Sequence, residues 1–84
     1  MKSNESIVNT IKEYILTNII RSNVDLEQDT PLLQSGYLTS LQTLELVAFL
    51  SETYHIEIEP EEITEEEFGS LIAIAALVQR KLPT

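Results

Sequence analysis

Apolar residues recur at spacings of three and four along the first part of the chain. The positions are Ile7, Val8, Ile11, Tyr14, Ile15 and Ile19. This spacing places them on one face of a helix and predicts a helix that ends near Arg21. Isoleucine also suits strands, but the length of the pattern and the absence of glycine and proline favour the helix.

A second helical pattern, over residues 40–54, is apolar on two sides. One broad side carries Leu46, Val47, Phe49, Leu50 and Tyr54, and the other carries Leu41, Leu44 and Ala48 together with Glu45 and Glu52. The first side is expected to face the core, and the second is expected to be an exposed docking face for a partner with basic residues around a shallow groove. The alternative is that the loop over residues 24–38 folds across Leu41 and Leu44.

The residues before and at position 40 indicate where this second helix begins. A turn at Gly36 precedes Thr39, which is a good N-cap, and Gln42 completes a Thr-x-x-Gln capping box. Ser40 then occupies the first helical position, where its hydroxyl can point outward at the positive end of the helix dipole. Two interpretations stay open at this point: Ser40 carries a phosphate-linked group, or it is itself the helix cap.

Residues 24–38 mix turn residues with leucines, which are expected to pin this long loop to the core. The alternating acids Asp25, Glu27 and Asp29 invite a calcium-loop interpretation. That template requires glycine at its sixth position and glutamate at its twelfth, where this chain has Thr30 and Gly36. The EF-hand interpretation therefore fails.

The last third of the chain is expected to contain a short helix and a final long one. Residues 55–59 alternate like a strand, but without a partner strand they are expected to form an extended connection that tucks Ile56 and Ile58 inward. Thr64 and Glu67 predict another capping box, with Phe68 anchored in the core. The final helix is expected over residues 70–81, with the buried stripe Leu71, Ile74, Ala75 and Val78. Together these elements predict an all-α, small four-helix bundle with three main helices and one short helix, forming one domain over residues 1–84.

Composition and charge narrow the function. The chain of 84 residues contains no cysteine, and His55 is its only histidine, so the residues offer neither a metal-ligand cluster nor a catalytic nucleophile with its base. The net charge is −9, with no Lys or Arg between Arg21 and Arg80, which argues against nucleic acid and anionic lipid as ligands. No segment has membrane-spanning length or the pattern of a signal peptide, so a soluble, cytoplasmic protein is expected.

Three segments of the chain resemble the acyl carrier protein and peptidyl carrier protein family. They are residues 29–33 (DTPLL), 35–41 (SGYLTSL) and 44–47 (LELV), and the similarity continues through residues 56–58 and 63–64 to the final helix. The resemblance implies an acyl-carrier-like fold in which Ser40 is esterified with 4′-phosphopantetheine. It also implies that Glu45 and Glu52 meet basic partner enzymes, beside an apolar strip made of Leu41, Leu44 and Ala48. The family usually has aspartate where this chain has Thr39, which leaves open which transferase accepts it.

The function implied by this resemblance is that of a free-standing, monomeric carrier that holds an acyl or aminoacyl group as a thioester. Its partners would be a phosphopantetheinyl transferase, an adenylating or other acyl-loading enzyme, and downstream acyl-processing enzymes. The carrier would be a cosubstrate and not an enzyme. Specialised-metabolite biosynthesis is the favoured setting, and the alternatives are an acyl carrier of fatty acid or polyketide synthesis and a D-alanine carrier. A rival of another class is a helical adaptor that binds its partner noncovalently.

Overall fold

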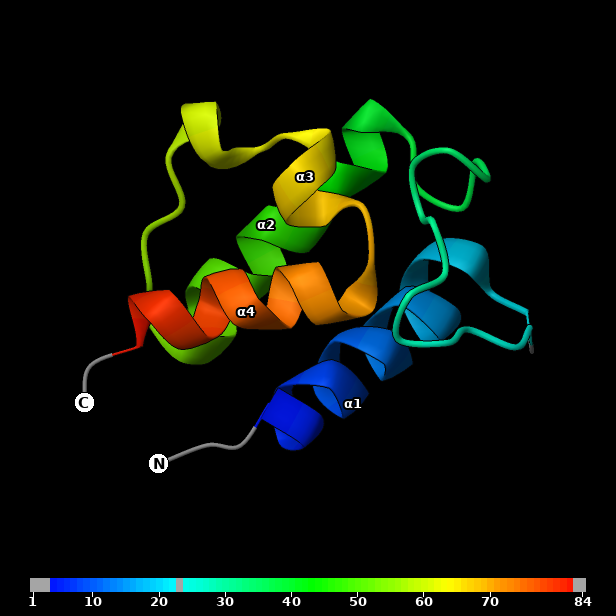
Figure 1. Cartoon of the computed structure of the whole chain (residues 1–84), viewed down its shortest axis with the longest axis horizontal. Coiled ribbons are helices and arrows are strands. Elements are labelled where there is room, and N and C mark those ends of the chain that lie inside the picture. The colour runs from blue at the N-terminus through cyan, green and yellow to red at the C-terminus, as the bar shows by residue number, and fades with distance from the viewer. Residues whose placement is uncertain (1–3, 23, 83–84) are drawn as a thin grey trace.

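The structure of this protein is a computed structural model that describes residues 4–22 and 24–82. All regular secondary structure in these residues is helical, as the sequence predicts (Figure 1). The elements are α1 (Asn4–Tyr14), a π-helical continuation (Ile15–Ile20), α2 (Ser40–Tyr54), a 3₁₀ turn (Pro60–Glu62), α3 (Glu65–Phe68) and α4 (Leu71–Lys81). The predicted bundle of three main helices and one short helix is confirmed.

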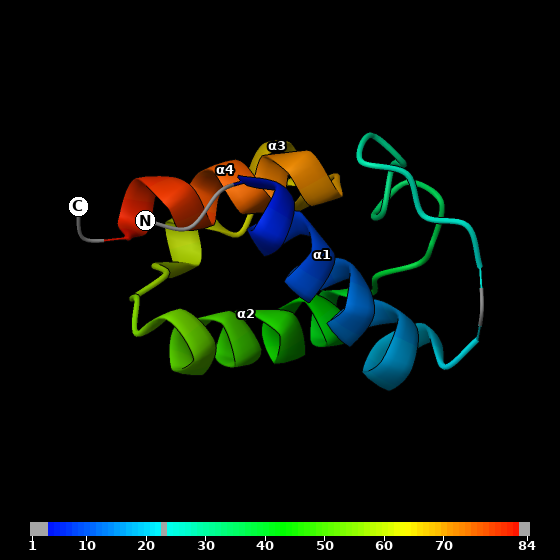
Figure 2. The same ribbon diagram turned by 90° about the horizontal axis from the view of Figure 1, so that it is seen from below.

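The three long helices enclose one apolar core. Figure 2 shows α4 above α2, and α1 crosses both helices obliquely. From α1 and its π-helical continuation the core takes the predicted residues Ile7, Val8, Ile11, Ile15 and Ile19, and from α4 it takes Leu71, Ile74, Ala75, Leu77 and Val78. The predicted stripe of α4 is thus confirmed, and Leu77 widens it.

The first helix ends differently from the expected regular helix. Its last six residues, Ile15–Ile20, form π-helical turns, and the chain then leaves the helix at Arg21 with a φ of 59°. Within this stretch the side-chain amide of Asn18 donates to the carbonyl oxygen of Tyr14 (3.4 Å). A side-chain donor therefore engages a carbonyl that a regular α-helix would bond through its backbone.

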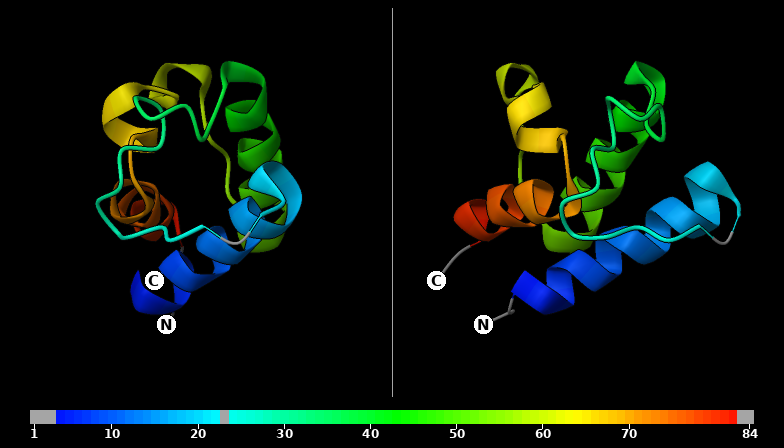
Figure 3. Two further views of the ribbon diagram at one scale, coloured as in Figure 1. Left: turned by 90° about the vertical axis from the view of Figure 1, so that its right-hand side faces the viewer. Right: turned by 45° about the vertical axis from the view of Figure 1, so that its right-hand side comes forward.

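The loop between α1 and α2 is fixed by both side chains and backbone. Leu26, Leu32 and Leu38 are buried, so the expectation that leucines pin this loop is confirmed. The backbone N–H of Leu32 also donates to the carbonyl oxygen of Gly69 (2.7 Å), and that of Ile72 donates to Gln28 (3.0 Å). Figure 3 shows the loop passing from the end of the first helix, by α3, to the start of α2. These bonds tie the approach to α2 to the α3–α4 junction.

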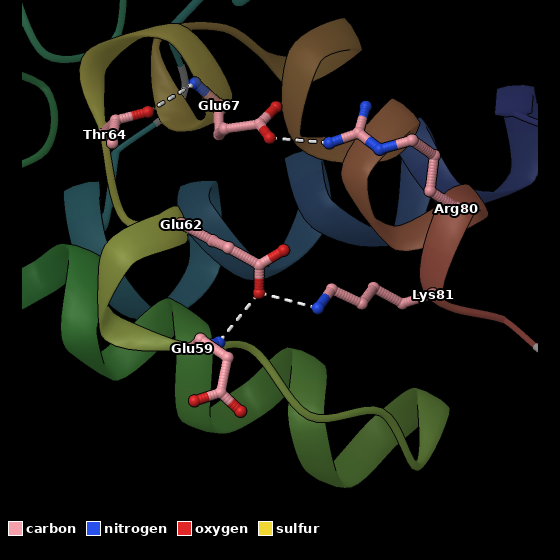
Figure 4. Close-up of polar contacts among 6 residues, drawn as sticks. All are labelled: Glu59, Glu62, Thr64, Glu67, Arg80 and Lys81. Atoms are coloured by element: carbon pink, nitrogen blue, oxygen red, sulfur yellow. Dashed lines mark hydrogen bonds and ion pairs between the residues drawn. The ribbon is translucent and has the colours of Figure 1, made fainter.

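The connection from α2 to α4 follows the prediction with one exception. Ile56 and Ile58 are partly buried against the core, and Phe68 is fully buried. The Thr64 hydroxyl accepts from the N–H of Glu67 (3.2 Å) and caps α3. The expected return contact from the Glu67 side chain is not formed, because that carboxylate binds Arg80 instead (Figure 4).

Candidate functional site

The first turn of α2 is held by the predicted capping box. The Thr39 hydroxyl accepts from the backbone N–H of Gln42 (3.2 Å), and the Gln42 side chain accepts from the backbone N–H of Thr39 (3.1 Å). Ser40 is the first residue of the helix, as predicted. Because Thr39 supplies the cap, the alternative in which Ser40 is the cap is wrong.

Thr43 adds a bond that the sequence did not indicate. Its side chain is buried, and its hydroxyl donates to the carbonyl oxygen of Thr39 (2.8 Å), the same oxygen that accepts the backbone N–H of Thr43 (2.8 Å). A buried hydroxyl requires such a partner, and this one lies within its own helical turn. The turn that presents Ser40 is therefore fixed on both sides of that residue.

The Ser40 side chain is exposed, and within residues 4–22 and 24–82 its hydroxyl has no hydrogen-bond partner. The first N–H groups of a helix lack helical partners and carry the positive end of its dipole. A phosphate group on the hydroxyl of Ser40 would therefore lie in a favourable field. The preceding turn contains Gly36 at a φ of +87°, a conformation that glycine adopts without strain.

Among residues 4–22 and 24–82, no histidine lies beside the hydroxyl of Ser40. His55 is exposed at the opposite end of α2, where it forms the C-cap. A helix of 15 residues spans roughly 22 Å at 1.5 Å per residue. The arrangement suits a hydroxyl that receives a group from another enzyme, and it does not resemble an activated nucleophile.

The predicted docking face of α2 is exposed. Leu41 and Leu44 are 69% and 54% exposed, and Ala48, Glu45 and Glu52 are exposed as well. The opposite side is in the core, with Leu46, Leu50 and Tyr54 buried and Val47 and Phe49 partly buried. The two-sided prediction is confirmed, and the loop over residues 24–38 leaves Leu41 and Leu44 largely uncovered.

A groove of about 370 Å³ begins at Ser40. It lies between the start of α2 and the segment that contains the 3₁₀ turn and α3. Its lining is mostly apolar and consists of Leu33, Ser40, Thr43, Leu44, Pro60, Ile63, Thr64, Glu65 and Phe68. The sequence had not indicated the groove, because its walls come from three separate parts of the chain.

Two ion pairs join the far side of this segment to the end of α4 (Figure 4). Glu62 Oε1 lies 2.6 Å from Lys81 Nζ, and Glu67 Oε2 lies 2.6 Å from Arg80 Nη2. The hydrogen bond from Lys81, followed by the one from the backbone N–H of Glu59, lowers the pKa of the Glu62 carboxyl below its ordinary value of 4.5. The two cations that end α4 are thus paired with acids far away in the sequence.

Among the described residues, the charged one that lines the groove is the acid Glu65. No Lys or Arg occurs between Arg21 and Arg80, and the two cations at the end of α4 are already paired. Across residues 4–22 and 24–82 no group of acids and histidine is arranged to hold a metal ion. None of the helices found there is long and apolar enough to cross a membrane.

Two comparisons with known proteins give matches. The family model described as "Phosphopantetheine attachment site" matches residues 9–79. The chain is also similar to a solved structure titled "Crystal structure of FAD-dependent dehydrogenase", with 33% identity and a TM-score of 0.75. That match covers 81% of this chain and 97% of the other chain, so the two chains are of similar size. No curated protein matches significantly.

Proposed function

Since this chain belongs to the family of phosphopantetheine attachment domains, the family of acyl and peptidyl carrier proteins, we propose that Ser40 carries its 4′-phosphopantetheine group. In this family the group is attached covalently to a serine. We propose further that the whole chain is one carrier domain acting as a cytoplasmic monomer. The group supplies a thiol on a flexible arm, on which a cargo is held as a thioester.

The serines within the family match differ in what their surroundings allow. The match contains Ser22, Ser35, Ser40, Ser51 and Ser70. The Ser35 hydroxyl donates to the carbonyl oxygen of Leu32 (3.4 Å), and the Ser70 hydroxyl caps α4. Ser51 is partly buried in the last turn of α2, and Ser22 lies outside any helix. Ser40 alone among these combines an exposed, unpartnered hydroxyl with a helix N-terminus, and this observation carries the assignment.

The residues around Ser40 fit the attached group. The N–H groups of the first turn of α2 can receive a phosphate oxygen, and the capping box keeps that turn from unwinding. The groove beside Ser40 offers apolar side chains along which the arm or a small cargo can lie. The chain's own contribution is to present and orient the arm, and catalysis belongs to the partner enzymes.

The test is the intact mass of the chain after incubation with coenzyme A and a broad-specificity phosphopantetheinyl transferase. We expect a gain of one phosphopantetheinyl group in the wild type and in Ser35→Ala, and no gain in Ser40→Ala. A gain in Ser40→Ala would move the site to another serine. No gain in the wild type with several such transferases, together with partner binding unaffected by Ser40→Ala, would instead favour the noncovalent adaptor.

The partner surface that we propose is the docking face of α2, beginning at Thr39. Leu41, Leu44 and Ala48 form its apolar strip, and Glu45 and Glu52 add negative charge. Partner enzymes with basic residues would be steered to this face and would leave it readily, as a carrier requires. Thr39 is neutral, so a transferase that needs a negative charge beside the serine should favour a Thr39→Asp variant.

For the cargo we propose a small aminoacyl or acyl group, loaded by an adenylating enzyme in specialised-metabolite biosynthesis. The solved structure titled as an FAD-dependent dehydrogenase favours a flavin-dependent dehydrogenase among the downstream enzymes. Such an enzyme would oxidise the Cα–Cβ bond of the thioester. The flavin of that enzyme would supply the two-electron oxidant, so that a proton from Cα and a hydride from Cβ would leave the cargo and an α,β-unsaturated thioester would remain on the arm.

This finer proposal can be tested on carriers loaded with a panel of acyl and aminoacyl groups. The loaded carrier would be incubated with the dehydrogenase named by that structure. Loss of two hydrogens from the cargo, seen in the intact mass, is the expected result. An unchanged mass for every cargo would count against the dehydrogenase as a partner while leaving the assignment of Ser40 intact.

A further inference from the structure

The segment over residues 60–68 has two faces with different contacts. Ile63, Thr64 and Phe68 line the groove beside Ser40. Glu62 and Glu67 instead extend to the end of α4, as Figure 4 shows. The same short segment is therefore a wall of the groove on one side and a partner of α4 on the other.

Each of the two carboxylates serves both the segment and α4. Glu62 Oε1 accepts the backbone N–H of Glu59 (2.9 Å) and also the ammonium of Lys81 (2.6 Å). Glu67 donates its backbone N–H to the cap at Thr64 (3.2 Å), and its carboxylate receives the guanidinium of Arg80 (2.6 Å). Losing either cation would remove an attachment to α4, and a helix as short as the four residues of α3 depends on such tertiary contacts for its stability.

Backbone bonds and apolar packing also hold this segment in place. Its backbone bonds from Ile63 to Pro60 and from Phe68 to Thr64 are internal. Beyond those, Phe68 is anchored in the core, Ile63 packs against it, and the carbonyl oxygen of Gly69 accepts from the backbone N–H of Leu32 at the end nearest α4. Among the described residues, the two ion pairs add side-chain links from both ends of this segment to α4.

We propose that the Glu62–Lys81 and Glu67–Arg80 ion pairs form a strap that holds the wall of the groove, and that competing cations loosen it. The side chains of both pairs are partly exposed, with relative exposures of 26% and 27% for Lys81 and Glu62 and of 56% and 30% for Arg80 and Glu67. Dissolved salt and external basic groups can therefore reach them. A partner that places Lys or Arg beside the end of α4 would compete for the same carboxylates, and the groove would widen as that partner docks.

Amide hydrogen exchange, measured by NMR on the unmodified full chain, tests the strap without any attached group. The Arg80→Gln/Lys81→Gln variant should exchange the amides of Ile63 and Phe68 roughly three- to tenfold faster, the range expected for two exposed ion pairs. Wild type in 1 M salt should show the same pattern, because the Debye length falls to about 3 Å. Amides of α1 should be unchanged, and Lys12→Gln is the control for charge alone.

A groove-lining thiol gives a second readout. The chain contains no cysteine, so Ile63→Cys introduces a single probe, and a neutral maleimide avoids a direct effect of salt on the reagent. Labelling of Ile63→Cys should speed up when both cations are replaced, whereas labelling of Val47→Cys on α2 should not.

A charge swap keeps the proposal falsifiable if the double variant is broadly destabilised. Arg80→Glu alone should accelerate exchange at Phe68, and adding Glu67→Arg should restore the wild-type rate by re-forming the pair in reverse. Wild-type exchange rates over residues 60–69 in the double variant would overturn the strap. So would acceleration spread equally over α1, or the absence of rescue by the swap.

Discussion

The rings of Tyr14 and Phe49 stack with their centroids 4.0 Å apart and an angle of 17° between their planes. Tyr14 ends α1 and Phe49 lies in α2, so the contact joins the first helix to the helix that presents Ser40. Both side chains are only partly buried, which leaves the stack at the edge of the core. The orientation of α2 therefore depends on an aromatic pair in addition to the aliphatic core.

This stack predicts a coupling between the two rings. In a double-mutant cycle with Tyr14→Leu and Phe49→Leu, we expect a coupling free energy of about 0.5–1.5 kcal/mol, the usual contribution of an aromatic pair beyond its burial. Urea unfolding followed by circular dichroism would measure it. A cycle that pairs Tyr14→Leu with Val47→Ala is the control, and equal coupling in both cycles would contradict a specific role for the stack.

The two sides of α2 should separate stability from recognition. Leu50→Ala should lower the free energy of unfolding by about 2–5 kcal/mol, because it empties a fully buried site. Leu41→Ala should change it by less than about 0.5 kcal/mol, since that side chain is 69% exposed. In the same protein samples, Leu41→Ala should reduce the rate of modification by the transferase. Equal destabilisation by the two substitutions would refute the two-sided assignment.

The acids of the docking face should attract the transferase through charge interactions that dissolved salt weakens. Glu45→Gln combined with Glu52→Gln should raise the KM of the transferase severalfold at low salt, with a much smaller effect on kcat. The difference from the wild type should shrink as salt is added. Glu5→Gln, an exposed acid on α1, is the matched control and should have little effect. A salt-independent difference would point to a contact other than charge.

The Glu62–Lys81 pair predicts an acid-sensitive contribution to stability. The pKa of Glu62 is lowered in the folded chain by its hydrogen bonds with Lys81 and with the backbone of Glu59, and in smaller part by the charges of Lys81 and Arg80. A lowered pKa means that the contribution is present above the ordinary value of 4.5 and is lost as pH falls through the folded value. Wild type should therefore be more stable than Lys81→Gln near neutral pH.

That stability difference should diminish below pH 4.5 as Glu62 becomes protonated. Urea unfolding at a series of pH values would measure it. Arg80→Gln reports separately on the neighbouring pair with Glu67, and Lys12→Gln controls for net charge. A difference between wild type and Lys81→Gln that persists unchanged into strong acid would mean that packing of the Lys81 stem, and not its charge, is responsible.

The turn before α2 should tolerate little change at Gly36. Its φ of +87° disfavours any side chain, although open space surrounds the position. Gly36→Ala should therefore cost roughly 1–2 kcal/mol through backbone conformation alone, and Gly36→Asn should cost less because asparagine tolerates positive φ better. Thermal unfolding of the three proteins would show this order. Equal stability of all three would mean that the turn relaxes to another conformation.

The sequence was sufficient wherever the determining interactions are local. The capping box of Thr39 and Gln42, the position of Ser40 and the two faces of α2 all depend on residues within a few turns of one helix. Periodicity likewise identified Ile7, Ile11 and Ile74 as buried. These features repeat at the spacing of a helix and need no knowledge of the rest of the fold.

The features that the sequence did not reveal depend on distant residues or on backbone atoms. The carboxylate partners of Arg80 and Lys81 are distant in the sequence and become neighbours of these cations only in the folded chain. The groove arises in the same way from residues of the loop, α2 and the α3 segment. The hydroxyl bond of Thr43 was missed because threonine in a helix has no side-chain signature that distinguishes a buried position from an exposed one.

The hydrogen bonds from Leu32 to Gly69 and from Ile72 to Gln28 connect main-chain atoms only. Every amino acid except proline can supply the donors, and every amino acid can supply the acceptors. The exposed side chains of Gln28 and Ile72 can therefore be substituted without loss of the backbone hydrogen bond between these two residues. Substitutions at Gln28 and Ile72 could therefore be used to create a binding surface for a different enzyme, and Ser40 would keep its position.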